Sequence, residues 1–272
     1  MIREDNGYKI LKPNDDLQKR KEYWEIAKGL QKVDGLETSQ YLETIIEDTV
    51  GGKYDTKIAE KKVEEYYLEI NPDSPENQNR EADLVSTRIT VCLEKDDFKF
   101  SPVMLKSIHK DLFHDILPYK WVGAFRSVNI TKDEEILKGK SVKYANWDTI
   151  QEYLKYDFDE QKNVRYTLPF TSEQVRAFSN FISGIWQTHP FREGNTRTIS
   201  TFLIKYLRNL GMEINNDPFK QYSDWFRDAL VRSNYSDLQK RIHPEFLYLN
   251  MFFENILMNA GHDLNSLDLR CY

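Results

Sequence analysis

The sequence H-P-F-R-E-G-N-T-R-T occupies residues 189–198 and separates two segments that have the apolar spacing of buried helices. Before it, Thr171 and Gln174 have the spacing of a capping box, which predicts the start of a helix. Pro190 predicts the end of that helix, because a proline disfavours helical conformation in the preceding residue. After it, apolar residues repeat at helical spacing through residues 199–210, and Gly211 is placed as a C-terminal stop. The sequence therefore predicts a loop between two buried helices.

The residue types in this loop suit the chemistry of phosphate groups. The second helix should begin near Gly194, where first-turn N–H groups without intrahelical partners and the positive end of the helix dipole can bind phosphate. Arg197 can pair with phosphate oxygens, Asn195 adds a neutral donor, and Gly194 allows an oxyanion to approach the backbone. Glu193 is a candidate ligand for Mg²⁺, which prefers carboxylates together with phosphates and water. His189, with an ordinary pKa of about 6.5, is a candidate general base. Together these residues predict phosphoryl or nucleotidyl transfer.

The loop resembles the motif of the Fic family, H-x-F-x-(D/E)-G-N-G-R-x-x-R, with matches at His189, Phe191, Glu193, Gly194, Asn195 and Arg197. Members of that family usually transfer AMP from ATP to a protein hydroxyl. The resemblance implies that His189 deprotonates the target side chain, that Glu193 places Mg²⁺ on the phosphates and that Phe191 anchors the loop. It also implies that Gly194, Asn195 and Arg197 hold the phosphates. Downstream, Asn234 in S-N-Y-S-D corresponds to an asparagine that contacts the adenine end in family members.

Two positions depart from the family motif. Thr196 replaces the second glycine, so its side chain either narrows the anion site or contributes a hydroxyl to phosphate. Ser200 replaces the final arginine. In the family, that arginine meets the γ-phosphate or pairs with the glutamate of an inhibitory helix that carries (S/T)-x-x-x-E-(G/N). With Ser200 in this place, the chain lacks the arginine on which both γ-phosphate binding and the usual autoinhibition depend in the family.

The N-terminal region resembles the antitoxin-like module that accompanies some Fic domains. The sequence D-G-L-E at residues 34–37, followed by a predicted helical hairpin, would place Leu30 and Asp34 at the Ser/Thr and Glu positions of the inhibitory motif. Asp34 is one methylene shorter than glutamate, and without an arginine at position 200 it lacks the bidentate partner the family offers. We therefore expect weak autoinhibition through this pair. A frame shifted to Ser39 and Glu43 fits less well, because Thr44 follows where Gly or Asn belongs.

The predicted fold class is all-α, a mainly helical Fic fold with a short β-hairpin flap. Residues 1–70 are the expected antitoxin-like helical module, residues 71–80 the linker and residues 81–265 the Fic domain, with the flap at about 128–145 and the catalytic loop at 189–198. Within the module, Ser39 predicts the start of a helix that runs to Val50, and Gly51 and Gly52 break it. By the resemblance, the flap follows G-A-F-R at residues 123–126, and its exposed edge pairs with a target segment. An ordinary surface hairpin is the alternative.

The composition of the chain excludes or disfavours several other classes of protein. The 272 residues contain 40% hydrophobic residues, which is enough for a sizeable core. A net charge of −6 argues against general nucleic-acid binding, and no apolar run is long enough to span a membrane. The two cysteines and the absence of an apolar signal sequence favour a cytoplasmic protein. No two histidines have zinc-binding spacing, and core or capping roles are expected for His109 and His114.

The predicted function is transfer of AMP from Mg²⁺-bound ATP to a Ser, Thr or Tyr hydroxyl of a protein, including self-modification. One alternative is a related enzyme that transfers another phosphate-containing group or removes AMP. The other is a degraded Fic-like module that binds a partner without catalysis. The aromatic stretch at residues 246–257 is interpreted as core or as the surface of a homodimer.

Overall fold

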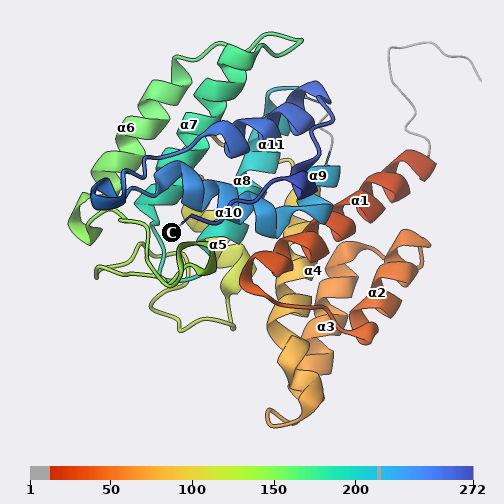
Figure 1. Cartoon of the computed structure of the whole chain (residues 1–272). Coiled ribbons are helices and arrows are strands. Elements are labelled where there is room, and N and C mark those ends of the chain that lie inside the picture. The colour runs from red at the N-terminus through yellow and green to blue at the C-terminus, as the bar shows by residue number, and fades with distance from the viewer. Residues whose placement is uncertain (1–12, 213–215, 272) are drawn as a thin grey trace, which may run out of the picture.

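The structure is a computed structural model that describes residues 13–212 and 216–271. Its α-helices, shown in Figure 1, are α1 (Pro13–Gln31), α2 (Gln40–Val50), α3 (Thr56–Glu69), α4 (Arg80–Glu94), α5 (Pro102–Phe113), α6 (Ile150–Lys162), α7 (Ser172–Thr188), α8 (Asn195–Asn209), α9 (Asp217–Gln221), α10 (Ser223–Asn234) and α11 (Leu247–Met258). No β-strand is present in the part of the chain that the structure describes. The predicted mainly helical class is confirmed.

The helices that flank the loop form where local sequence signals predict them. The Thr171 side chain accepts a hydrogen bond from the backbone N–H of Gln174, whose own side chain accepts one from the backbone N–H of Thr171, so the capping box at the start of α7 is confirmed. The helix ends at Thr188, because His189 turns into the left-handed region at φ 47°. A second left-handed residue, Gly194 at φ 69°, immediately precedes α8. The two left-handed residues therefore mark the end of α7 and the start of α8, and residues 189–194 form the loop between them.

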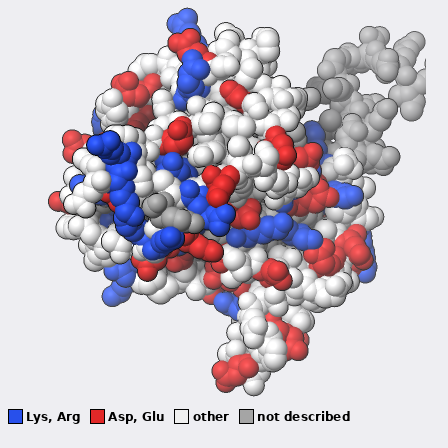
Figure 2. All heavy atoms as spheres, in the orientation of Figure 1, with Lys and Arg blue, Asp and Glu red and all other residues white. Residues whose placement is uncertain are grey.

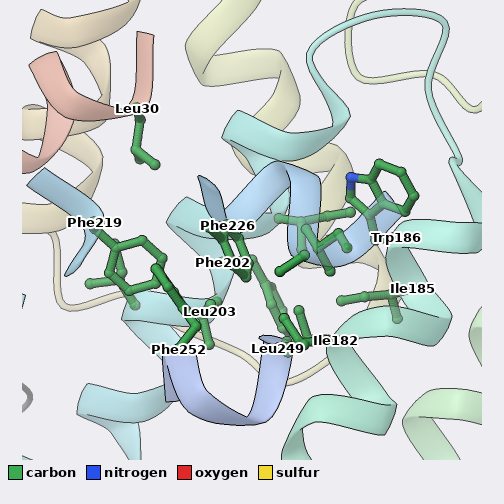
Figure 3. Packing of buried hydrophobic residues seen from close by; sticks show 14 of the residues in the cluster. Leu30, Ile182, Ile185, Trp186, Phe202, Leu203, Phe219, Phe226, Leu249 and Phe252 are labelled. Carbon is green, nitrogen blue, oxygen red and sulfur yellow. The ribbon is translucent and has the colours of Figure 1, made fainter. Parts of the chain in front are cut away.

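A single hydrophobic cluster surrounds this helix pair. Figure 3 shows Ile182, Ile185 and Trp186 of α7 packed with residues from α8, α10 and α11. Leu30 of α1 belongs to the same cluster. The α11 residues that face it are buried, as expected for the core interpretation of the aromatic stretch; they are Leu249, Phe252, Phe253 and Ile256. Burial of so many apolar side chains holds the loop on a rigid base.

The N-terminal hairpin consists of α2 and α3, and its predicted cap is confirmed. Ser39 accepts a hydrogen bond from the backbone N–H of Leu42 at 3.1 Å, α2 ends at Val50, and Gly51 and Gly52 follow. A smaller hydrophobic cluster lies between these helices, α1 and α4; it contains Trp24, Leu42, Ile45, Ala59, Val63, Tyr67 and Leu84. Helix α4 packs against both α1 and α3, so the two clusters meet along it. The division at residues 71–80 stays a prediction.

The expected β-hairpin at residues 128–145 is reduced to one antiparallel bridge between Glu134 and Lys140. This bridge closes a 3₁₀ turn at Glu135–Leu137, so no ladder extends from it. Arg126 explains part of the difference. Its guanidinium donates hydrogen bonds to the carbonyls of Val128 and Ala145, which are acceptors that a hairpin would use for pairing. The segment is therefore a loop that Arg126 closes at its base, and we call residues 128–145 the flap segment.

The surface mixes charges of both signs. Figure 2 shows Lys and Arg interspersed with Asp and Glu over the visible face. Within the described residues, no helix combines the length and the apolarity that crossing a bilayer requires.

Candidate active site

The predicted loop lines a pocket of about 240 Å³, which we call the loop pocket. Six residues of the loop line it, namely the x-position residue Arg192 and the five residues His189, Glu193, Gly194, Asn195 and Thr196. The other lining residues come from the N-terminal region, the flap segment, α7 and α10; they are Asp34, Ile130, Thr131, Lys132, Trp186 and Arg227. The volume suits the phosphate part of a nucleotide better than a whole nucleotide, since sites for complete ligands usually exceed about 300 Å³.

His189 is held in one orientation. Its Nδ1 lies 3.2 Å from the carbonyl oxygen of Trp186, which only accepts hydrogen bonds, so Nδ1 carries the proton and Nε2 is left as the basic nitrogen. The ring of Tyr144 stacks on the imidazole, with centroids 4.0 Å apart. Burial, with smaller contributions from the nearby cations Lys132, Arg126 and Arg227, lowers the pKa of His189 to about 3, although the hydrogen bond to the Trp186 carbonyl acts in the opposite direction. The imidazole is therefore neutral at physiological pH and able to accept a proton.

Phe191 anchors the loop as the resemblance implies, and His109 supports it. The Phe191 ring is fully buried and stacks on the imidazole of His109 at 4.0 Å. Nδ1 of His109 accepts a hydrogen bond from the backbone N–H of Gly123, so its Nε2 donates to the carbonyl of Glu193 at 3.2 Å. His109 is thus a core residue, as expected, but it also ties the loop to the segment that precedes the flap.

Asn195 has a different task from the predicted one. Its side-chain oxygen accepts a hydrogen bond from the backbone N–H of Phe191 at 2.9 Å, and its side-chain nitrogen donates to the carbonyl of Phe191 at 2.8 Å. Both polar atoms of the amide therefore help to close the loop, and the second N–H of the side-chain nitrogen is not used in these two bonds.

Gly194 and Glu193 complete the turn into α8. Any Cβ on Gly194 would overlap the ring of Phe113, so packing requires glycine here as strongly as the positive φ does. The Glu193 side chain is exposed at the pocket, and its Oε1 accepts a hydrogen bond from the backbone N–H of Gly194 at 3.2 Å. Its second carboxylate oxygen has no hydrogen-bond partner within the described chain. One free carboxylate oxygen beside a phosphate site fits the donor set that Mg²⁺ prefers.

Arg197 faces the N-terminal region and not the loop pocket. Its Nη1 donates to the side chain of Gln31 at 3.2 Å and its Nη2 to Glu81 at 2.7 Å. Its Nε lies 2.8 Å from Oδ2 of Asp34, an ion pair in which the N–H is not aligned with the oxygen. The guanidinium also stacks over the ring of Phe113. In this arrangement Arg197 is not available to phosphate.

This geometry corrects the premise of the autoinhibition argument. Asp34 was expected to have no arginine to pair with, yet Arg197 takes that place, and Lys132 of the flap segment lies 3.5 Å from its other oxygen. The fully buried hydroxyl of Ser200 has no hydrogen-bond partner among the described residues. Leu30, at the Ser/Thr position of the inhibitory motif, is buried in the main core.

The two remaining predicted residues have partners in the interior. Thr196 accepts a hydrogen bond from the indole N–H of Trp186 at 3.1 Å and lines the loop pocket. Asn234 is not brought to the pocket; its side-chain nitrogen donates to the Ser183 hydroxyl at 2.9 Å and to the Leu230 carbonyl at 2.9 Å. It therefore joins α10 to α7.

Three cations that our sequence analysis did not assign line the pocket: Lys132, Arg192 and Arg227. The sequence could have indicated Arg192, because it lies between the assigned residues Phe191 and Glu193. It could not have indicated Lys132 and Arg227, because they lie far from the motif in the sequence, in the flap segment and in α10. Arg227 forms an ion pair with the buried carboxylate of Glu134, to which the Tyr144 hydroxyl also donates at 3.3 Å.

Comparison with known proteins identifies the family. A sequence model of the Fic/DOC family matches residues 99–207. A probable protein adenylyltransferase, y4lH of Sinorhizobium fredii, is 30% identical over 174 residues, which cover 61% of this chain and 81% of that protein. The chain belongs to the Fic/DOC family.

Other Fic relatives are longer proteins of Bartonella. The protein adenylyltransferase VbhT of Bartonella schoenbuchensis is 30% identical over 120 residues, which cover 44% of this chain and 23% of VbhT. A protein adenylyltransferase of Bartonella henselae is 26% identical over 186 residues, covering 61% of this chain and 33% of that protein. The chain thus spans less than two thirds of either protein.

Among solved structures, the N-terminal Fic domain of Bep8 from Bartonella sp. 1-1C has a TM-score of 0.49 at 19% identity, covering 66% of this chain and 86% of that one. The N-terminal Fic domain of a Bep effector from Bartonella sp. AR 15-3 has a TM-score of 0.48 at 19% identity, covering 76% and 87%.

Proposed function

We propose that this chain is a protein adenylyltransferase that transfers AMP from Mg²⁺-bound ATP to a Ser, Thr or Tyr hydroxyl of a protein. The observation that carries the proposal is the single basic nitrogen of His189 at a pocket shared with the start of α8. The relatives named protein adenylyltransferases support the same activity.

His189 acts as the general base. Its Nε2 takes the proton of the target hydroxyl as that oxygen attacks the α-phosphorus, the new P–O bond forms, and the bond to pyrophosphate breaks. Nδ1 stays bonded to the Trp186 carbonyl and Tyr144 stays stacked on the ring, so the imidazole is positioned before the target arrives.

The start of α8 and the cations of the pocket hold the phosphates. First-turn N–H groups have no intrahelical partners, and Lys132, Arg192 and Arg227 add positive charge around them. Glu193 would hold Mg²⁺ through its free carboxylate oxygen. When bound, the ion neutralises charge on the phosphates.

The flap segment is the proposed docking site for the target. Ile130, Thr131 and Lys132 line the pocket, so an extended target chain beside them would bring a hydroxyl toward His189. The proposal includes self-modification, because Thr131 of the pocket lining and other residues of the chain carry hydroxyl groups to which AMP can be transferred. A need for ATP and Mg²⁺ supports a cytoplasmic setting.

A catalytically idle binding module is the second candidate, because Arg197 is paired with Asp34 and Glu81 and does not face the pocket. The N-terminal helices would then act as an antitoxin-like inhibitor that is permanently engaged.

Incubation of a lysate and the purified chain with α-labelled and, separately, γ-labelled ATP distinguishes these functions. Protein label from the α-position alone, lost on His189→Ala, is the expected result. Label from the γ-position would show phosphoryl transfer instead. Undiminished α-label in His189→Ala would reject the mechanism, and absence of label from either position, also in Asp34→Ala, would favour the idle module.

A further inference from the structure

The hydroxyl of Thr196 has a hydrogen-bond donor on one side and no acceptor on the other. The indole N–H of Trp186 can only donate, so at 3.1 Å the Thr196 oxygen must be the acceptor. The hydroxyl hydrogen then points elsewhere, and no acceptor for it lies within the described residues. A buried hydroxyl hydrogen without an acceptor costs free energy unless a ligand or water supplies one.

Two other threonine hydroxyls of these helices donate to a carbonyl of their own helix, whereas the buried hydroxyl of Thr198 in α8 has no hydrogen-bond partner among the described residues. Thr201 donates to the carbonyl of Arg197 at 2.8 Å, and Thr188 donates to the carbonyl of Gly184 at 3.1 Å, each four residues earlier in its own helix. Thr196 cannot do this, because the residue four positions before it is Arg192, which precedes α8. Its position in the first turn therefore leaves the hydroxyl free for another partner.

The free hydroxyl belongs to the loop pocket. Thr196 is 7% exposed, and both it and Trp186 line that pocket. Figure 3 shows the Trp186 indole at the edge of the hydrophobic cluster, at the end of α7. The first-turn N–H groups of α8 lack intrahelical partners as well, so backbone and side-chain donors occur together. Lys132, Arg192 and Arg227 line the same space together with Asp34 and Glu193, and Lys132 is paired with Asp34 and Arg227 with Glu134. The groups that favour an anion here are therefore mainly the first-turn N–H groups, the Thr196 hydroxyl and Arg192.

We infer that Thr196 donates a hydrogen bond from its hydroxyl to a phosphate oxygen of the bound nucleotide, and that Trp186 is the positioning residue that directs it. The inference rests on the proposed function, since it assigns the ligand as a nucleoside triphosphate. It gives Thr196 a direct role where the family motif has a glycine without a side chain. The indole holds the Thr196 oxygen in place, because the β-branched side chain is stiff at χ1 and one lone pair of the hydroxyl accepts the indole N–H, which turns the hydroxyl hydrogen away from the indole.

The test compares binding of Mg²⁺-ATP and of adenosine by isothermal titration calorimetry. Thr196→Val removes the hydroxyl and keeps the shape, and we expect about tenfold weaker ATP binding, as for one hydrogen bond to a charged group, with adenosine binding unchanged. Thr196→Ser should bind ATP as the wild type does. The matched control is Thr201→Val, which makes the same substitution at a fully buried site of the same helix and should leave ATP binding unchanged.

A double-mutant cycle tests the role of the indole. Trp186→Phe should weaken ATP binding less than Thr196→Val does, and the double variant should bind no more weakly than Thr196→Val alone, because the indole acts through the hydroxyl. Additive losses would show that Trp186 acts on its own and would overturn the positioning role.

Two further outcomes separate the inference from the proposed function. Wild-type affinity for ATP in Thr196→Val, or an equal loss for ATP and adenosine, would overturn the role of the hydroxyl while leaving the proposed function intact. Failure of both the wild type and Asp34→Ala to bind ATP would overturn the proposed function and the inference together.

Discussion

Nε of Arg197 lies 2.8 Å from Oδ2 of Asp34, so the arginine of the phosphate-binding motif is paired with a carboxylate of the N-terminal region. Gln31 and Glu81 hold the other two nitrogens of the same guanidinium. Three residues outside the motif thus keep Arg197 from the loop pocket. From this contact we predict, in contrast to our expectation of weak autoinhibition, that Asp34 competes with phosphate for Arg197.

Replacement of Asp34 by alanine should raise AMP transfer. We expect an increase of about tenfold at limiting ATP, as for the loss of one competing charged contact, and a larger increase when Glu81→Ala is combined with it. Transfer of label from α-labelled ATP measures the effect. Asp48→Ala, which removes a carboxylate of the same N-terminal region that pairs with Lys53, should change nothing. An unchanged rate in Asp34→Ala would restore the original expectation.

The acid limb of the rate profile should lie at unusually low pH. Burial lowers the pKa of His189 to about 3, so the base stays deprotonated as the pH falls from 8 to about 5. The value of kcat/KM should therefore be flat across this range, with loss only as the pH approaches the lowered pKa. A base of ordinary pKa would lose about tenfold by pH 5.5. ATP binding measured over the same range separates protonation of His189 from effects on the nucleotide.

Asp157 should make the stability of the protein depend on pH. Burial against α7 raises the pKa of this carboxyl from 3.8 to about 6. The folded state therefore holds the proton more tightly than the unfolded state, and the free energy of unfolding falls as the pH rises through the window from about 4 to 6. Asp157→Asn should raise that free energy by about 1–2 kcal/mol at pH 8, because a half-buried charge is removed, and change it little at pH 4.

Urea unfolding at both pH values checks this. The control is Asp159→Asn, which changes the net charge equally but removes an exposed carboxylate paired with Lys155 and Lys162, and it should give no gain at pH 8. Equal stabilisation by both substitutions would indicate a general charge effect instead.

Gly194→Ala should be strongly destabilising. The new Cβ meets the ring of the fully buried Phe113 and also has to adopt a φ of 69°. The positive φ costs about 1 kcal/mol and the overlap about 2 kcal/mol more. Gly139→Ala isolates the first effect, because its φ is 78° and its Cβ would meet no atom within 4 Å. Equal losses of unfolding free energy in the two variants would contradict the packing role of Gly194.

Much of the loop could be predicted from the sequence because its signals are local. The capping box at Thr171, Pro190 after His189, and Gly194 before α8 each act on their immediate neighbours, so the helix ends follow from residue type and spacing. The apolar repeats of both helices fix which faces are buried for the same reason.

The partners of polar side chains could not be predicted in this way. Asn195 carries the groups of a phosphate ligand but uses them on the backbone of Phe191, and Asn234 uses its amide on α7. The flap segment was predicted as a hairpin, yet Arg126 donates hydrogen bonds to backbone carbonyls at both ends of that segment. The partners of Asn195 are only four residues away, but Ser183 for Asn234 and the Ala145 carbonyl for Arg126 come within reach only after the chain has folded.

The sequence by itself determined the helical class, the loop between α7 and α8, and the residue types for phosphate chemistry, because these depend on periodicity, caps and a short motif. The tertiary structure decided which cations face the pocket. It turned Arg197 toward Asp34 and brought Lys132 and Arg227 from distant segments to the pocket. The physical reason is that a charge pairs with whichever opposite charge packing brings within a few ångströms, and sequence spacing does not encode that distance.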